Sequence, residues 1–318
     1  MIKENETSGL DFVLLGFSHL QNQRVLVFLV FLVLYSLTVF GNTITILIIS
    51  LDLQLHTPMY LFLGDLSLLD ICHTCVTIPK LLIHVISKDR SISYPGCVTQ
   101  LFVFTSKAST ECGLLAVMTY DRYLAICKPL HYTETMTFRR CLVLATMPWM
   151  AGFLQSSIHT IFTFQLSFCQ PRIIDNFFCE IPSLLKLSCS ATYLNEIVLF
   201  CTGSLFSLSP FVLTFFSYAF IITSVLQIPY IECRRKAFST CGSHLAVVSM
   251  FYFGAMFVYF RPKSSYSLSI DRLVSIFYTL LTPLLNPPIY CLKNNDVKGA
   301  MKKIFIKKYK NLNPKREL

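Results

Sequence analysis

Seven long apolar stretches divide this 318-residue chain, and they constrain its fold more than any other feature. A helix needs about 20 apolar residues to cross a hydrocarbon core about 30 Å thick, and each stretch is that long. Only 14% of the residues are charged, against about 25% in soluble domains. We therefore predict an all-α, seven-transmembrane-helix bundle. Its spans run over roughly residues 25–50, 58–84, 97–127, 140–164, 195–226, 237–260 and 271–291.

The direction of the spans is predicted by a glycan acceptor and by charge. Asn5 begins an N-x-T triplet, which places the N-terminus outside the cell if the asparagine is glycosylated. Lys and Arg gather in the loops after spans 3 and 5 and in the tail, as the positive-inside rule expects for cytoplasmic segments. We thus predict an extracellular segment over 1–24, a membrane domain over 25–291 and a cytoplasmic tail over 292–318, in a multi-pass protein of the cell membrane.

The tail carries lysines and apolar residues at helical spacing between about 293 and 310. This pattern predicts a short amphipathic helix on the anionic inner leaflet. A solvated basic tail is the alternative.

Four cysteines fall on the side predicted to be oxidising. Three lie in the loop of about 30 residues between spans 4 and 5, a length usual for functional or cross-linked loops, and the fourth begins span 3. Four cysteines allow three pairings, and the spacing does not choose among them. They are Cys97, Cys169, Cys179 and Cys189.

Ionisable side chains lie well inside two spans. Asp70 is in span 2, and Lys107 and Glu111 are in span 3, where such groups are costly and mark functional sites. Lys107 and Glu111 have the i, i+4 spacing of an ion pair, which we favour over a ligand contact for the lysine. A transporter or channel is one alternative function for these charges, but the chain shows no duplicated halves. No motif of a membrane enzyme is present, so we expect no catalytic residues.

The end of span 3 carries the most specific motif. Residues 118–132 read MTYDRYLAICKPLHY, and they resemble the MAYDRYLAICxPLHY motif of odorant receptors, a family of rhodopsin-like G-protein-coupled receptors. Four further stretches agree: LHTPMYLFL over 55–63, SY over 217–218, KAFSTCGSHL over 236–245 and PLLNPPIY over 283–290. The resemblance covers about residues 10 to 305. The chain departs from the family pattern at Gly64, Asp65, Phe253 and Pro288.

The resemblance implies a receptor for a small, mostly hydrophobic odorant that activates a stimulatory, olfactory-type heterotrimeric G protein and raises cyclic AMP. Membrane lipids and trafficking chaperones are the other expected partners, and nucleic acid is not. A member of the family that senses a metabolite outside the olfactory epithelium is the nearer alternative.

The resemblance also implies roles for single residues. Asp121 and Arg122 are expected to pair in the inactive state, and the arginine then meets the G protein. The expected switch residues are Asp121, Arg122, Tyr123, Tyr218, Asn286 and Tyr290. The family pattern further pairs Cys97 with Cys179 and Cys169 with Cys189.

A ligand pocket is expected between spans 3, 5, 6 and 7, although each of its residues could equally serve helix packing. Most are apolar or aromatic, with a few hydroxyls, as a hydrophobic ligand requires. They are Phe104, Thr105, Ala108, Ser109, Cys112, Thr202, Phe206, Tyr252, Ala255, Met256, Tyr259, Ile276 and Thr279.

A polar network inside the bundle is the last implied site. Asn42, Asp70, Glu111 and Asn286 match positions that hold Na⁺ in similar receptors, and hard cations favour such oxygen ligands. A water-filled structural network is the alternative. We expect no other cofactor and no other metal.

Overall fold

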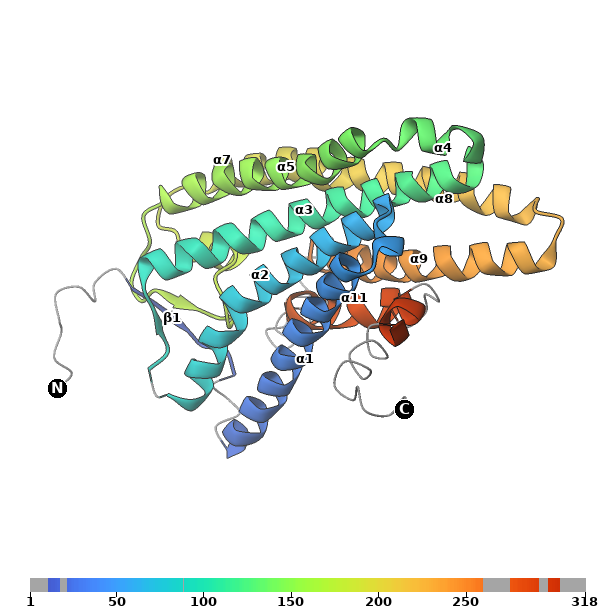
Figure 1. The fold of residues 1–318 in the computed structure, drawn as a ribbon. Helices are drawn as coiled ribbons and strands as arrows, with labels where there is room; N and C mark the ends of the chain where they lie inside the picture. The colour runs from blue at the N-terminus through green and yellow to red at the C-terminus, as the bar shows by residue number, and fades with distance from the viewer. Residues whose placement is uncertain (1–10, 18–21, 88, 260–274, 292–296, 304–318) are drawn as a thin grey trace, which may run out of the picture.

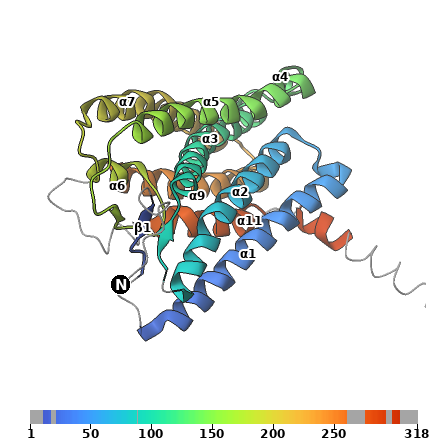
Figure 2. The same cartoon turned by 90° about the vertical axis from the view of Figure 1, so that its left-hand side faces the viewer.

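The computed structural model describes the chain except residues 1–10, 18–21, 88, 260–274, 292–296 and 304–318. Within the described ranges, long helices run side by side as a bundle, and a small sheet closes one end (Figures 1 and 2). Asn5 and its glycan acceptor triplet lie outside these ranges.

The helices match the seven predicted spans, which confirms the all-α bundle. Five are long and apolar enough to cross a membrane, and a sixth run, Cys241–Gly254, is apolar but shorter, as judged within the described ranges. The seventh is described from residue 275. The spans are α1 (Arg24–Leu51), α2 (Pro58–Ile86), α3 (Tyr94–Cys127), α5 (Phe138–Phe164), α7 (Tyr193–Gly203) with η4 (Ser204–Leu208) and α8 (Ser209–Leu226), α9 (Ile231–Tyr259), and η6 (Phe277–Leu281) with α11 (Thr282–Cys291).

The helix starts follow local sequence signals. Pro58 occupies the first turn of α2, where the missing N–H costs nothing. At the start of α3, the Ser93 hydroxyl accepts a hydrogen bond from the Gly96 N–H at 3.3 Å. In contrast, α9 begins at Ile231, earlier than the predicted 237, because its first turns carry charged residues that hydropathy does not count as span.

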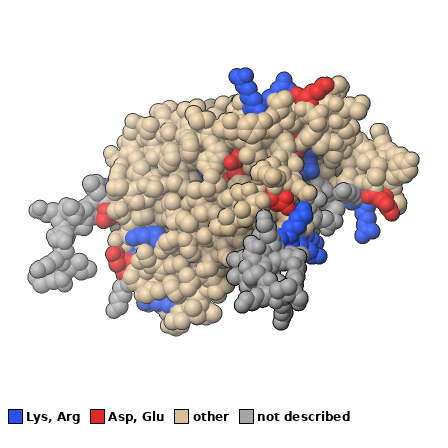
Figure 3. Space-filling view, viewed as in Figure 1, with Lys and Arg blue, Asp and Glu red and all other residues tan. Residues whose placement is uncertain are grey.

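α3 is the central helix of the bundle. Of its most apolar window 61% is buried inside the protein, against 17% for α1. Many large apolar side chains of α1 and α8 are therefore exposed on the outside of the bundle, where lipid replaces water as the solvent. On the face seen in Figure 3, a mostly uncharged band separates charged side chains that gather toward the two ends.

A three-stranded sheet, which the sequence analysis did not predict, closes one end. β1 (Phe12–Leu14) pairs antiparallel with β2 (Ser91–Ile92) and parallel with β3 (Ile173–Ile174), so that segments far apart in the chain meet. Phe12 and Leu14 are buried while Val13 between them is exposed, the alternation of a half-buried strand.

Two disulfides fasten the same end, which we call the disulfide end. Cys97 at the start of α3 joins Cys179, and Cys169 joins Cys189. These are the pairs that the family resemblance implies. The loop between α5 and α7 also contains β3 and the short helix α6 (Ile181–Lys186).

The opposite end, which we call the Arg122 end, carries the short helix α4 (Pro129–Thr135) and the residues that follow span 7. Residues 297–303 are helical, with Val297 and Ala300 buried and Lys298 and Lys302 exposed, as an amphipathic helix requires. The Lys303 ammonium donates to Gln54 Oε1 at 2.5 Å and lies 3.7 Å from Asp52 Oδ2. The rest of the predicted 293–310 helix lies outside the described ranges.

Candidate functional site

Asp121 and Arg122 lie in the last two turns of α3, but they do not form the expected ion pair with each other. The Asp121 carboxylate is buried and accepts a hydrogen bond from the Tyr132 hydroxyl of α4 at 2.8 Å. No ion pair of the described residues includes Arg122, and its buried Nε has no hydrogen-bond partner. The reason is helical geometry, since neighbouring residues on a helix do not face each other.

The Tyr132 hydroxyl is held in its protonated form. Burial, and then the adjacent Asp121 carboxylate, raise the pKa of Tyr132 well above its usual 10. The hydroxyl therefore remains a donor to Asp121 at any physiological pH.

Three aromatic side chains, Tyr218, His244 and Tyr290, lie together at the Arg122 end. The Tyr218 hydroxyl of α8 lies 2.6 Å from His244 Nδ1 of α9, and the His244 ring lies 6.3 Å from the ring of Tyr290 on α11. Tyr123 packs beside them, with its ring 6.4 Å from Phe220. The structure thus brings the predicted switch residues of spans 3, 5 and 7 to one end of the bundle.

A polar network lies deeper between the helices. The Asn286 amide donates to Asp70 Oδ2 at 2.7 Å, and the Asn42 amide donates to the Pro283 carbonyl at 3.0 Å. Asn42, Asp70 and Asn286 are all buried, so α1, α2 and α11 are joined through their side chains. The Lys107–Glu111 ion pair, which we favoured from the spacing, is present on α3.

The residues predicted to line a ligand pocket divide into separate environments. Phe104 packs near the disulfide end, with its ring 5.0 Å from Phe178 and 5.5 Å from Tyr278. Tyr252 lies deeper, with its ring 4.8 Å from Phe211, in the same apolar cluster as Cys112. Thr105 and Thr279 are buried, and Ala108, Phe206 and Ile276 are partly buried. The side chains of Ala255, Met256 and Tyr259 lie outside the described part of the chain.

Two of the predicted ligand hydroxyls turn toward α5 instead. Ser109 donates a hydrogen bond to Gln155, and Thr202 Oγ1 lies 2.8 Å from His159 Nε2. Each hydroxyl therefore has a partner on the fourth span, and its role toward a ligand stays a prediction.

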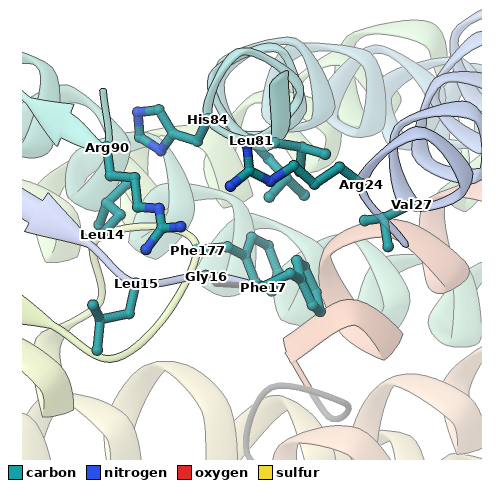
Figure 4. Close-up of a pocket in the computed structure, with 11 residues that line it drawn as sticks. Leu14, Leu15, Gly16, Phe17, Arg24, Val27, Leu81, His84, Arg90 and Phe177 are labelled. Carbon is teal, nitrogen blue, oxygen red and sulfur yellow. The ribbon is translucent and has the colours of Figure 1, made fainter. Parts of the chain in front are cut away.

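Two cavities lie away from these residues. One, at the disulfide end, has a volume of about 30 Å³, close to that of one water molecule. The Arg24 and Arg90 guanidinium groups point toward it, beside His84 (Figure 4). A second, of about 460 Å³, is an open groove over Tyr120, Met136 and Arg140 at the Arg122 end. Neither cavity includes a predicted ligand residue.

Glu180 forms a partly buried polar cluster at the disulfide end that sequence reasoning missed. Its Oε1 accepts from the Asn176 amide at 2.9 Å and from the Ser183 hydroxyl at 2.8 Å, and its Oε2 accepts from Tyr278 at 3.3 Å. Burial raises the pKa of Glu180 above its usual 4.5, and these hydrogen bonds oppose that shift. The cluster links the disulfide-bonded loop to the seventh span.

Other functional candidates were visible in the sequence but were given no role. Tyr132 and His244 both belong to the quoted motifs, at the last position of the span 3 motif and next to the end of the span 6 motif. Gln155 and His159 are polar residues one turn apart inside span 4. For His244, Gln155 and His159, the available signal was a polar residue inside an apolar span.

A seven-span bundle with charges buried at its centre, and an arginine beside a tyrosine cluster at one end, defines a multi-pass membrane protein of receptor type. The chain belongs to the olfactory receptor family, since the family profile described as olfactory receptor matches residues 31–308. Olfactory receptor 2G3 of Homo sapiens is 48% identical over 94% of this chain and 97% of its own length. Olfactory receptor 5AR1 of Mus musculus is 46% identical over 97% of this chain and 99% of its own length.

Proposed function

We propose that this chain is an odorant receptor that binds a small, mostly hydrophobic organic molecule within its bundle. Binding activates a stimulatory, olfactory-type heterotrimeric G protein, which raises cyclic AMP. Membership of the olfactory receptor family supports the class of ligand. The coupling to a G protein is argued from the Arg122 end.

The observation that carries the coupling is the Arg122 side chain, for which the described residues provide no partner at Nε. Its Nε is buried without a hydrogen-bond partner, and a buried unsatisfied donor is costly. Asp121, the nearest acid in sequence, is already bonded to Tyr132. An incoming helix C-terminus, with its free carbonyl groups and negative dipole end, supplies the acceptors that Arg122 lacks.

The bound odorant acts through the helices that surround Arg122. A ligand shifts an equilibrium only by its different affinity for the two states. Contacts between the odorant and α9 would therefore change the position of α9 relative to α3 and α8. The Tyr218–His244 hydrogen bond joins α8 to α9 beside Arg122, so it is the contact through which such a shift reaches the G-protein surface.

The predicted direction across the membrane fits this assignment. The disulfide end faces the extracellular side, where cysteines are oxidised, and the Arg122 end faces the cytoplasm. Glycosylation of Asn5 belongs to the same proposal. In this proposal the pocket lies between spans 3, 5, 6 and 7, where Phe104 packs nearer the disulfide end and Tyr252 packs deeper.

A cyclic AMP assay tests the proposal in cells that express surface-labelled receptor, over a broad odorant panel. We expect a concentration-dependent response to at least one odorant, and its loss in Arg122→Ala at equal surface amounts. Arg139→Ala, which removes an exposed arginine of α5 at the same end, is the matched control and should respond as the wild type does. A full response from Arg122→Ala would exclude the proposed role of the arginine.

A further inference from the structure

The centre of the bundle holds one lysine beside two carboxylates. Asp70 on α2 and Glu111 on α3 are fully buried, and Lys107 on α3 is 4% exposed. These groups lie where the sequence analysis expected a sodium site. The side chains that pack around the two carboxylates identify the cation that balances their charge.

The Lys107 ammonium lies near side chains of three helices. It forms the ion pair with Glu111 one turn further along α3. It interacts electrostatically with Asp70 across the α2–α3 interface. It also lies 5.9 Å from the centre of the Phe251 ring of α9, within the range of a cation–π interaction. A covalently attached cation thus lies between α2, α3 and α9.

The oxygen atoms around this cluster would suit a cation if the lysine were absent. Among the described residues, Oδ1 of Asn42, of Asp70 and of Asn286 each lack a hydrogen-bond partner, and oxygen ligands of this kind suit hard cations. However, within the described ranges no three His, Cys, Asp or Glu side chains come together as a metal site.

The ammonium itself opposes a second cation. Two unit charges about 4 Å apart at an effective dielectric constant of about 20 repel enough to weaken binding roughly a thousandfold. One ammonium beside two carboxylates leaves at most one net negative charge, so these residues fit an added sodium ion less well than the same site would without Lys107. Water molecules are the donors that the remaining carboxylate and amide oxygens require.

We propose that Lys107 is the built-in counter-ion of Asp70 and Glu111, and that its ammonium takes the place of an exchangeable sodium ion. The cation of this receptor cannot leave, because it is bonded to α3. The stability of the folded receptor is consequently independent of sodium, unlike that of a bundle whose central charge is balanced by a free ion. This inference concerns the folded protein and does not rest on the proposed function.

Thermal unfolding of the purified full-length receptor in lipid nanodiscs tests the proposal. The unfolding midpoint is measured in NaCl and in choline chloride at equal ionic strength. We expect the wild type to unfold at the same midpoint in both salts. Lys107→Met keeps the length of the side chain but removes its charge, so this variant should gain a midpoint that rises with Na⁺ concentration, as a ligand that binds only the folded state requires.

Three further variants separate this role from general effects of charge. Lys107→Arg restores a tethered cation and should be insensitive to sodium. Lys80→Met removes a lysine from α2 outside the buried cluster, and it should gain no sodium dependence. Adding Glu111→Gln to Lys107→Met should abolish the gained dependence.

Two results would overturn the proposal. One is a wild type that sodium stabilises over choline. The other is a Lys107→Met receptor that folds but remains indifferent to sodium. If Lys107→Met does not fold, the wild type and Lys107→Arg still decide, since sodium dependence in either one contradicts a built-in counter-ion.

Discussion

The Tyr218 hydroxyl and His244 Nδ1 lie 2.6 Å apart, with both side chains buried between α8 and α9. Their rings are also nearly parallel, with centroids 5.8 Å apart. The other ring nitrogen of His244 has no hydrogen-bond partner. Tyr218 is therefore the side chain that satisfies this histidine, and the two residues should behave as one unit.

A double-mutant cycle measures that unit. Tyr218→Phe leaves the buried His244 without a partner and should lower the free energy of unfolding by about 1–3 kcal/mol. Adding His244→Phe removes both partners, so the double variant should lose less than the sum of the single losses, with a coupling of about 0.5–3 kcal/mol. Thermal unfolding in nanodiscs gives these values. Tyr230→Phe, at an exposed tyrosine, is the control and should change little; strict additivity of the two losses would exclude the coupling.

Close packing of α3 against α5 should depend on Gly152. A Cβ atom at this position would lie 2.8 Å from the Ser106 carbonyl oxygen, which belongs to rigid helix backbone. Gly152→Ala should therefore cost about 1–3 kcal/mol of stability by overpacking. Gly64→Ala is the matched control on α2, since a Cβ there meets nothing within 4 Å, and it should be neutral or stabilising by about 0.5–1 kcal/mol. Equal unfolding midpoints for the two variants would contradict this account of the interface.

The two disulfides should contribute unequally. Cys97–Cys179 joins residues 82 apart in sequence, while Cys169–Cys189 joins residues 20 apart. Because the longer loop restricts the unfolded chain more, replacing its pair by alanines should cost about 1 kcal/mol more than replacing the other pair. Chemical unfolding of the two double-alanine variants checks this order, with Cys201→Ala as the control at an exposed free cysteine. The reverse order would show that chain entropy does not dominate.

Glu180 should make stability depend on pH. Burial raises the pKa of Glu180 in the folded protein above 4.5, so the folded state binds the proton more tightly than the unfolded state does. Its contribution to stability is fully present below 4.5 and is lost as pH rises through the raised pKa. Glu180→Gln should remove this component from unfolding midpoints measured against pH.

Asp89, whose pKa is shifted in the opposite direction, provides the control for Glu180. The hydrogen bond from the Ser91 N–H holds the pKa of Asp89 below its usual 3.8. Asp89 therefore adds stability above 3.8, and that contribution is lost as pH falls through the lowered pKa. Asp89→Asn should leave the Glu180 component unchanged, and a Glu180→Gln receptor with the wild-type pH profile would contradict the assignment.

The spans could be predicted because backbone groups in lipid must be satisfied within the helix, so that each crossing is a long apolar run. The Lys107–Glu111 ion pair was equally predictable from the sequence, since its two residues lie one turn apart on one helix. The first turns of α9 were missed because their charged residues lie beyond the apolar stretch.

Contacts between segments that are distant in the chain could not be predicted from the sequence in this way. Tyr132 reaches Asp121 only because α4 folds back beside α3, and the two-residue strands β2 and β3 carry too little pattern to be recognised. Ser109 and Thr202 were chosen as ligand hydroxyls by position, but the direction of each depends on a partner in α5. Phe253, a departure from the family pattern, is 77% exposed, so it does not line a pocket in this structure.

The strand β1 sets an order of events during synthesis. Residues 12–14 leave the ribosome before the first span, yet one of their partners is in β2, after the second span, and the other is in β3, after the fourth. The earliest segment of the chain must therefore wait for its second partner strand until more than half of the protein has been made. Phe12 and Leu14, buried at the end, are exposed during that interval, and such exposed apolar strands invite misassembly. The closure of this end thus requires residues from the start of the chain to meet a strand made more than 150 residues later.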